Sequence, residues 1–431
     1  MKTNEHQAPI ENDAKKIRLD RSLPMPDFVG QRINNFQDRL NNSWGGSHLL
    51  HGLAPGPSAI HLYSNDYLCL SGESDLINAQ AAELFIGKNS LMSATFLHGE
   101  NAQNRLERKI ARYLDAQDGI ISQSGWAANV GLLQSLAGPK VPVYLDMQAH
   151  ASLWEGVSAA KAMPIPFRHN DICHMERQMT EYGPGIVAVD PVYSTNGSMC
   201  PLASLIEVSE KMGCIIVVDE SHSLGTHGPH GAGLVSALGM QDRVHFRTAS
   251  LAKAAAGRAG FITCSTQFKE YFMIESRPAI FSSCVLRHEI AWLDAVFDFL
   301  QSGICDARRM RLKFAAQSLR DGLDKLGYNV GDGTEQIIAL EAGLESQTMI
   351  LRDALQSNGI FGAVFCAPAT PRNRSLMRLT VNAGLTDIEI ERILFVCEKI
   401  RDQVQLSKWS STRRRKNKMQ SGSTHTLNKH N

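Results

Sequence analysis

The run Cys214-Ile-Ile-Val-Val-Asp-Glu-Ser-His222 decides the fold class, because its first five residues are apolar and a carboxylate, Asp219, follows them directly. A strand that is apolar on both sides is typical of a parallel sheet covered by helices on both faces. Gly185–Asp190 repeats the pattern, and from about Leu70 to Ser283 such runs alternate with helical patterns. This alternation predicts an α/β fold with a large parallel or mixed sheet.

The pattern changes after about Cys284. Leu312, Ala316, Leu319, Leu323 and Leu326 follow helical spacing up to Gly327, and Thr386-Asp-Ile-Glu389 resembles a capping box that opens a last helix reaching about Val404. We therefore expect a smaller C-terminal α+β domain. The expected divisions are an N-terminal arm over 1–69 with a helix near Phe28–Leu40, a large domain over 70–284, a small domain over 285–405 and a tail over 406–431.

The C-terminal tail is basic. From residue 403 to 431 there is no Asp or Glu, and without the seven basic residues of this stretch the net charge of the chain falls from +1 to −6. The tail is rich in Ser, Thr and Asn and has few apolar residues, which predicts that it is disordered. Basic tails can contact nucleic acid or anionic lipid. A solvated appendage is the alternative that we adopt, and no nucleic-acid partner is expected.

Composition excludes several classes of protein. The 431 residues contain no apolar run near the ~20 residues that span a bilayer, so no membrane span is expected. The first 20 residues are polar and do not resemble a secretory signal. Nine scattered cysteines without a CxxC pair argue against a disulfide framework and against a cysteine zinc site, and no metal is expected. The sequence predicts a cytoplasmic globular protein.

A lysine stands among small residues in Thr248-Ala-Ser-Leu-Ala-Lys253-Ala-Ala-Ala-Gly-Arg-Ala-Gly260, 34 positions after Asp219. Taken separately, Lys253 could be a surface residue of an alanine-rich helix, and Asp219 could merely start a turn. Together they fit pyridoxal phosphate, which needs a lysine for a Schiff base and a carboxylate for its pyridine nitrogen. The pair predicts this cofactor.

Three further segments could complete such a site. Ser122-Gln-Ser-Gly-Trp-Ala-Ala-Asn129 precedes a helical pattern, so it could bind a phosphate at a helix N-terminus or be an ordinary helix start. His150 follows a possible strand at Val143–Leu145 and could lie flat on the cofactor ring or at a domain surface. Arg378 lies in an apolar run and should meet a carboxylate, which could belong to the protein or to a substrate.

Competing signatures are incomplete. There is no GxGxxG fingerprint, Gly87-Lys88-Asn89-Ser90 lacks the Walker glycines, and His288-Glu-Ile-Ala-Trp292 lacks the second histidine of a zincin helix. Ser122-Gln-Ser124-Gly125 does not match G-x-S-x-G. Dinucleotide, nucleotide-phosphate, zinc-protease and serine-hydrolase readings are therefore not favoured.

The chain resembles the fold-type I pyridoxal-phosphate enzymes, and within them the α-oxoamine synthases, on Asp219, His222 and Lys253. It is most similar to the CqsA-type quorum-sensing autoinducer synthases, from about Pro24 to Val404. The motifs that carry this similarity are Ser64-Asn-Asp-Tyr-Leu68, Ser122-Gln-Ser-Gly-Trp126, Ser152-Leu-Trp-Glu-Gly156, Asp219-Glu-Ser-His-Ser-Leu-Gly-Thr-His-Gly-Pro229 and Val364-Phe-Cys-Ala-Pro-Ala-Thr370.

The resemblance implies a role for each matching residue. Lys253 would hold the cofactor and shuttle a proton, Asp219 would pair with the pyridinium nitrogen, and His222 would reach the ring hydroxyl. The remaining roles are ring stacking by His150, ring contact by Ser194, phosphate binding by Gly125, Trp126 and Ser250, phosphate contact from a second subunit by Ser282 or Ser283, and binding of the substrate carboxylate by Arg378. The family works as a homodimer.

The resemblance also implies the reaction. An acyl-CoA would condense with an amino donor to give an α-aminoketone, the precursor of an autoinducer. The chain departs from the general family at Leu91-Met-Ser-Ala-Thr-Phe96, Gln103, Ala252 and Leu385. The first two departures speak against glycine- or alanine-specific relatives and leave an aminobutyrate-like amino acid or S-adenosylmethionine as the donor. A housekeeping α-oxoamine synthase, of the aminooxononanoate synthase or aminoketobutyrate–CoA ligase type, is the alternative.

Overall fold

The structure, a computed structural model, describes residues 23–86, 91–331, 333 and 335–412. The chain forms two compact units, residues 1–48 and 49–431, and each is described by itself. In the first unit, α1 (Asp27–Asp38) continues into a π-helical turn, η2 (Arg39–Ser43), and the Phe36 and Trp44 rings meet edge to face at 6.0 Å. The helix predicted near Phe28–Leu40 is confirmed.

The larger sheet has seven strands in the order β2-β8-β7-β6-β5-β3-β4. Only β8 runs antiparallel to its neighbours, β2 and β7, so the sheet is mixed, as expected. The two runs that predicted buried strands form β5 and β6. The strands are β2 (Asp118–Ser122), β3 (Pro142–Asp146), β4 (Met163–Phe167), β5 (Ile186–Val189), β6 (Ile215–Asp219), β7 (Phe246–Ser250) and β8 (Gly260–Cys264).

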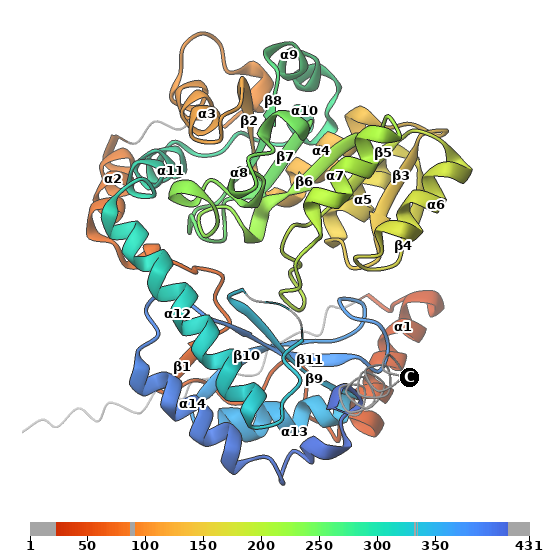
Figure 1. Cartoon of the computed structure of the whole chain (residues 1–431), viewed down its shortest axis with the longest axis vertical. Coiled ribbons are helices and arrows are strands. Elements are labelled where there is room, and N and C mark those ends of the chain that lie inside the picture. The colour runs from red at the N-terminus through yellow and green to blue at the C-terminus, as the bar shows by residue number, and fades with distance from the viewer. Residues whose placement is uncertain (1–22, 87–90, 332, 334, 413–431) are drawn as a thin grey trace, which may run out of the picture. The chain divides into compact units, whose positions relative to one another are not determined.

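Helices cover both faces of this sheet (Figure 1). On β5, Ile186 and Ala188 pack in the cluster that contains α4 and α5 side chains. Val187 and Val189 pack in the cluster that contains α6 and α7 side chains. Alternate residues of a strand point to opposite faces, which explains why the predicting runs are apolar throughout. The helices are α4 (Gly125–Leu136), α5 (Ala151–Ala160), α6 (Ile172–Tyr182), α7 (Leu202–Lys211), α8 (Leu234–Ala237), α9 (Thr266–Glu275) and α10 (Arg277–Phe281).

A second sheet has four strands in the order β1-β10-β11-β9. Its strands are β1 (Ile60–Leu62), β9 (Ile337–Gly343), β10 (Ile360–Phe365) and β11 (Ser375–Thr380). β1 comes from the interval predicted as the N-terminal arm and pairs in parallel with β10. The sequence did not mark this strand because three residues are too few for an alternating pattern. The remaining helices of this unit are α2 (Ser74–Ile86), α3 (Ala102–Tyr113), α11 (Arg287–Phe299), α12 (Gly303–Lys325), α13 (Glu345–Gln356) and α14 (Asp387–Lys399).

The two predicted C-terminal helices are present. α12 contains the apolar spacing and is followed by Gly327, whose φ is +90°. The capping box of α14 is formed, because Thr386 Oγ1 accepts from Glu389 N and the Glu389 side chain accepts from Thr386 N. The α-helix ends at Lys399 and turns continue to residue 405, so the predicted end near Val404 is too late.

The prediction of a disordered tail from residue 406 does not hold for Leu406–Thr412. Trp409 is only 1% exposed, donates from Nε1 to the Val404 carbonyl at 2.8 Å, and meets the Tyr328 ring edge to face at 5.7 Å. The tail is polar on average, so its composition did not indicate that the Trp409 side chain would be buried. The basic cluster that begins at Arg413 lies outside the described residues.

Candidate active site

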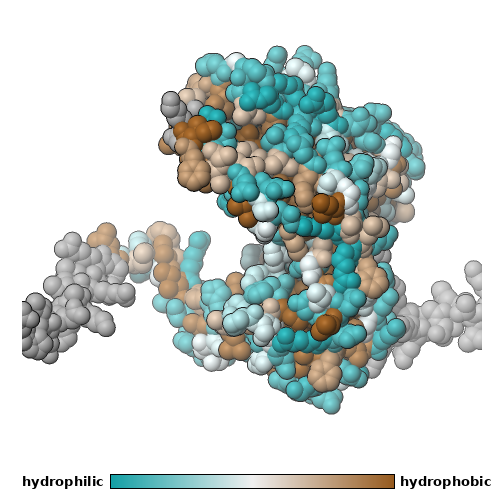
Figure 2. Space-filling view, turned by 90° about the vertical axis from the view of Figure 1, so that its left-hand side faces the viewer, coloured by the Kyte–Doolittle hydropathy of each residue, from teal (hydrophilic) through white to brown (hydrophobic). Residues whose placement is uncertain are grey.

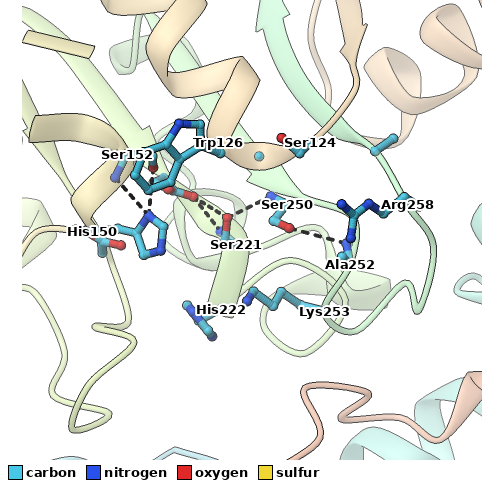
Figure 3. Close-up of a pocket in the computed structure, with 14 residues that line it drawn as sticks. Ser124, Trp126, His150, Ser152, Ser221, His222, Ser250, Ala252, Lys253 and Arg258 are labelled. Carbon is cyan, nitrogen blue, oxygen red and sulfur yellow. Dashed lines mark hydrogen bonds between the residues drawn. The ribbon is translucent and has the colours of Figure 1, made fainter. Parts of the chain in front are cut away.

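A cavity of about 280 Å³ lies where β5, β6 and β7 end, and 14 residues line it (Figure 3). The carboxyl ends of neighbouring parallel strands form the crevice in which ligands bind to such sheets. Seven of the sequence-predicted residues line this cavity: Gly125, Trp126, His150, Asp219, His222, Ser250 and Lys253. The other lining residues are Ser124, Ser152, Asp190, Ser221, Ala252, Arg258 and Ala259.

Lys253 lies in the turn that follows β7 and not on a helix, so the reading as a surface lysine of an alanine-rich helix is wrong. Its side chain extends into the cavity beside His222 (Figure 3). Burial lowers the pKa of the Lys253 amine, the nearby Arg378 lowers it further, and Asp219 acts in the opposite direction. The amine therefore loses its proton more readily than an exposed lysine, as a nucleophile or base requires.

Asp219 is the last residue of β6 and is 3% exposed. Its Oδ2 atom accepts a hydrogen bond from Asn129 Nδ2 at 2.7 Å. Its Oδ1 atom accepts from the Ser221 backbone N at 3.0 Å and from Ser221 Oγ at 2.5 Å. Three donors to one buried carboxyl group fix its orientation. Asp219 thus presents its carboxyl group in a fixed orientation at the cavity wall.

His222 lies in η5 (Glu220–His222), directly after β6, and is 3% exposed. The Tyr67 hydroxyl lies 2.6 Å from its Nδ1 atom. Burial lowers the pKa of His222 well below its usual value, and the charges of Lys253 and Arg378 add to the effect. His222 is therefore a neutral imidazole at physiological pH, able to donate or accept a hydrogen bond.

His150 is the N-cap of α5 and lines the same cavity. Its backbone N donates to Asp190 Oδ2 at 2.9 Å, and its ring meets the Trp126 ring at 6.2 Å with an interplanar angle of 80°. Burial lowers the pKa of His150; Asp219 opposes this shift and Lys253 adds to it. The ring is placed on the cavity wall and not at the outer surface.

The N-terminus of α4 forms the end of the cavity opposite His222. Ser124 is its N-cap, since Ser124 Oγ accepts from Ala127 N at 3.1 Å. A Cβ atom on Gly125 would lie 2.6 Å from Ser250 Cβ, and one on Gly260 would lie 2.2 Å from the Ser124 carbonyl oxygen. Glycine is therefore needed at both positions, because a side chain would prevent Gly125 from lying this close to Ser250 and Gly260 from lying this close to Ser124. The first N–H groups of a helix have no partner within the helix and bind anions such as phosphate.

Arg378 lies on β11 and does not line this cavity. Its Nη1 atom donates to the Ser194 carbonyl at 2.7 Å, its Nη2 atom donates to Asn65 Oδ1 at 2.9 Å, and its guanidinium carbon lies 4.6 Å from the centre of the Phe365 ring. Among the described residues no carboxylate pairs with it, and Nε has no hydrogen-bond partner. Among the described residues Arg378 therefore lacks the expected protein carboxylate, and its positive charge is available to bind another anion.

A second cavity, of about 770 Å³, shares His150 with the first. Ser194 lines this second cavity and not the first. Side chains that follow the large sheet's strands, such as Gln148 and Asn196, form one part of its wall, and Phe365 and Arg374 of the second sheet form another. The arrangement provides room for a substrate larger than an amino acid next to His150.

Ser282 and Ser283 are not brought to the cavity that contains Lys253. Ser282 follows α10 and lines a separate hollow together with Phe281, which is 81% exposed. Ser283 forms a bridge with Ser93, and its carbonyl accepts from Gln123 Nε2 at 2.7 Å. Neither serine lines the cavity that contains Lys253 in its own chain.

Sequence reasoning gave no role to several residues of the site. Asn129, Ser221 and Arg258 lie within the motifs that predict the site, and Asp190 is the acid that ends a predicted strand. Asn129 is one turn after Gly125 on α4, so helical spacing places it on the same side of the helix as the cavity. That spacing is the signal that could have identified it.

In the parts of the chain that the structure describes, no cluster of His, Cys, Asp or Glu could hold a metal, and no helix could cross a membrane.

Comparisons with known proteins agree on one group. The model of the family described as aminotransferase class I and II matches residues 57–396. The CAI-1 autoinducer synthase of Vibrio campbellii is 40% identical over 388 residues, which cover 90% of this chain and 98% of that protein. A putative 8-amino-7-oxononanoate synthase of Halalkalibacterium halodurans is 29% identical over 337 residues, which cover 77% of this chain and 84% of that protein. A serine palmitoyltransferase variant from S. paucimobilis, solved with a bound PLP–myriocin aldimine, has the same fold with a TM-score of 0.82 and 23% identity, over 88% of this chain and 100% of that one.

Proposed function

Because the chain belongs to the aminotransferase class I and II family, we propose that it is a pyridoxal-phosphate-dependent acyltransferase of the α-oxoamine synthase type. It condenses an acyl-CoA with an amino acid or an S-adenosylmethionine-type donor to give an α-aminoketone precursor of a quorum-sensing autoinducer. The resemblance found in the sequence and the fold-type I class are confirmed by the comparisons. The observation that carries the proposal is that Lys253 and Asp219 line one cavity with the N-terminus of α4.

The residues present fit pyridoxal phosphate. Gly125 lets the start of α4 lie directly against Ser250, and Gly260 lets β8 lie against the Ser124 carbonyl, because a Cβ atom at either position would clash there. The N–H groups at the start of α4 suit a phosphate. Gly125, Trp126 and Ser250 would hold the phosphate, and Asp219 would hold the proton of the pyridine nitrogen. When bound, the cofactor supplies an electron sink that stabilises a carbanion next to a substrate nitrogen.

The proposed catalytic roles follow from the charges of the side chains. Lys253 binds the cofactor, and its amine, whose pKa is lowered, then removes the proton from Cα of the amino substrate and returns one later. Neutral His222 would bond the ring hydroxyl, and His150 would cover the ring face. Arg378, which has no carboxylate partner among the described residues, holds the substrate carboxylate. The resemblance would give Ser194 a contact with the ring, but in this chain Ser194 lines the second cavity, which we assign to the acyl-CoA.

We further propose a cytoplasmic homodimer. Ser282 and Ser283 lie away from the cavity of their own chain, which supports a contribution from either serine to the phosphate site of a second subunit. Apolar side chains are exposed on the part of the molecule that carries the seven-stranded sheet (Figure 2). The exposed apolar side chains of the described residues include Phe281, Phe85 and Leu91, at 81%, 90% and 78% exposure, and burial against a second copy would remove them from water.

The cofactor proposal is tested with the full-length protein. We expect a yellow protein, and borohydride treatment followed by peptide mass spectrometry should find pyridoxyl on Lys253. Lys253→Ala should abolish the adduct and lower the rate of product formation by about 10³-fold or more. Lys140→Ala, at an exposed turn, is the control and should leave both unchanged. A colourless protein, or an adduct on another lysine only, would overturn the proposal.

The substrate is tested with a panel of acyl-CoAs and amino donors, using mass spectrometry of the products. Product from an aminobutyrate-like amino acid or from S-adenosylmethionine, with a medium- or long-chain acyl-CoA, is expected. Product from alanine or glycine alone would instead support a housekeeping α-oxoamine synthase, the activity named for relatives with lower identity.

A further inference from the structure

Three buried polar side chains and the half-buried His150 form one chain of hydrogen bonds along the cavity wall, in the order Asp219, Asn129, Ser152 and His150 (Figure 3 shows the Ser152–His150 end). Asn129 Nδ2 lies 2.7 Å from Asp219 Oδ2 and 2.8 Å from Ser152 Oγ. Ser152 Oγ lies 2.7 Å from His150 Nδ1. Asn129 and Ser152 are 1% and 0% exposed, so solvent does not compete for these bonds.

The direction of the first two bonds is fixed by chemistry. The Asp219 carboxylate already accepts from Ser221, and a carboxylate can only accept, so the atom of Asn129 that faces it must be the amide nitrogen. The oxygen of the Asn129 amide is consistent with this assignment, because Thr248 Oγ1 lies 2.6 Å from Asn129 Oδ1 and can donate to it. The second amide hydrogen then points to Ser152 Oγ, and the serine oxygen is an acceptor.

The direction of the last bond follows from this. Because Ser152 Oγ accepts from Asn129, its own hydrogen is free to be donated to His150 Nδ1. The Ser152 backbone N–H also points to Nδ1, at 3.3 Å. Two donors therefore converge on one ring nitrogen, and a proton on Nδ1 would oppose both. The favoured ring is neutral and carries its hydrogen on Nε2.

We propose that Asn129 and Ser152 are positioning residues that hold His150 as the neutral tautomer protonated on Nε2. The chain begins at Asp219, so the carboxylate that defines one wall of the cavity also sets the proton position on the histidine. Among the described residues, Nε2 has no hydrogen-bond partner. If the proposed function holds, its N–H is a donor for an acceptor atom of the bound substrate or cofactor.

Other charges face His150 from each neighbouring element. Asp219 ends β6, Asp190 follows β5 and accepts from the His150 backbone N, and Lys253 and His222 line the same cavity. A protonated His150 would be attracted to Asp219 and repelled by Lys253, whereas burial and the neighbouring Asp219 raise the pKa of Asp190 well above its ordinary value. The hydrogen-bond chain therefore prevents a second positive charge beside Lys253, which a charged His150 would otherwise introduce.

The test is hydrogen–deuterium exchange at the imidazole C2 atom, followed by mass spectrometry of the His150 peptide, as a function of pH. The midpoint of this exchange reports ring protonation and does not require activity. Ser152→Ala removes the donor to Nδ1 and should raise the midpoint by about one pH unit, the size expected from one lost hydrogen bond to the neutral ring. Asn129→Ala frees the serine hydroxyl to accept instead and should raise the midpoint in the same direction.

Two variants serve as controls. Ser152→Thr keeps the hydroxyl and should restore the wild-type midpoint, with or without added pyridoxal phosphate. Ser209→Ala removes a buried serine that bonds only the Leu205 carbonyl, at 2.7 Å, and should leave His150 unchanged. An unchanged midpoint in both Ser152→Ala and Asn129→Ala, or a Ser152→Thr midpoint that matches alanine, would overturn the proposal. These outcomes are independent of whether the protein is yellow or forms an aminoketone.

Discussion

Arg378 and Asn65 are joined by a hydrogen bond of 2.9 Å although they are 313 positions apart in the sequence. The contact exists because β1, just before Asn65, and β11, which carries Arg378, both pair with β10. The second arginine bond goes to a backbone carbonyl, at Ser194. Neutral acceptors therefore fix the guanidinium in place without neutralising its charge.

Loss of this guanidinium should weaken binding of the amino substrate. Hydrogen bonds to charged groups contribute about 1.5–3 kcal/mol, so Arg378→Met should raise KM for the amino donor by roughly 10- to 100-fold. Steady-state kinetics at saturating acyl-CoA measure the effect. Arg243→Met, at an exposed pair with Glu210, is the control. Equal KM values for the Arg378 variant and the wild type would contradict the assignment.

A methyl group at Gly125 should interfere with cofactor binding. In Gly125→Ala the new Cβ would lie 2.6 Å from Ser250 Cβ and 2.8 Å from Ser250 Cα, so the start of α4 must move away from β7. We expect the Kd for pyridoxal phosphate to rise by about 10-fold or more, since the helix N–H groups lose their alignment. Absorbance titration measures it. Gly138→Ala, where nothing lies within 4 Å, should bind normally. Tight binding in the Gly125 variant would exclude this phosphate position.

The buried His222 should make stability depend on pH. Its folded-state pKa lies well below the ordinary value near 6.5, so below that pH the unfolded chain binds a proton that the folded chain does not. The free energy of unfolding therefore falls as the pH drops below about 6.5, by up to about 1.4 kcal/mol per pH unit for this residue. His222→Gln should flatten that decline in urea unfolding between about pH 6.5 and 5. The matched change at the exposed His61 should not, and equal slopes in wild type and His222→Gln would refute the expectation.

Two ion pairs should differ in their effect on stability. Arg247 and Glu220 are 4% and 2% exposed and 3.1 Å apart, whereas Arg243 and Glu210 are 37% and 38% exposed. Glu220→Gln leaves a buried guanidinium without its anion and should lower the free energy of unfolding by about 3–5 kcal/mol. Glu210→Gln should lower it much less, because solvent screens the charges of an exposed pair. Guanidinium-chloride unfolding of both variants measures the two losses. Similar losses would show that the bonds from the Arg247 guanidinium to the Leu114 and Ala232 carbonyl oxygens suffice without Glu220.

Helices and strands could be predicted from the sequence where their pattern of apolar or capping residues extends over several positions. The run that ends at Asp219 is buried on both faces, and Thr386 forms the capping box that its spacing indicated. β1 has only three residues and was missed. Trp409 was missed for a related reason, since one buried aromatic side chain does not change the composition of a polar tail.

The class of the sheet could be read from residue types along the chain, because strands covered on both faces are apolar throughout. The same reading pointed to Lys253, Asp219, His222 and His150, which line one cavity in the structure. The proton positions and the hydrogen-bond partners followed only from the folded chain, since they depend on distances between residues that are far apart in the sequence. The Asn129 amide bonds Asp219, 90 positions away, and the Arg378 guanidinium meets no carboxylate among the described residues. No pattern along the chain could specify such contacts, because they arise from the packing of separate elements.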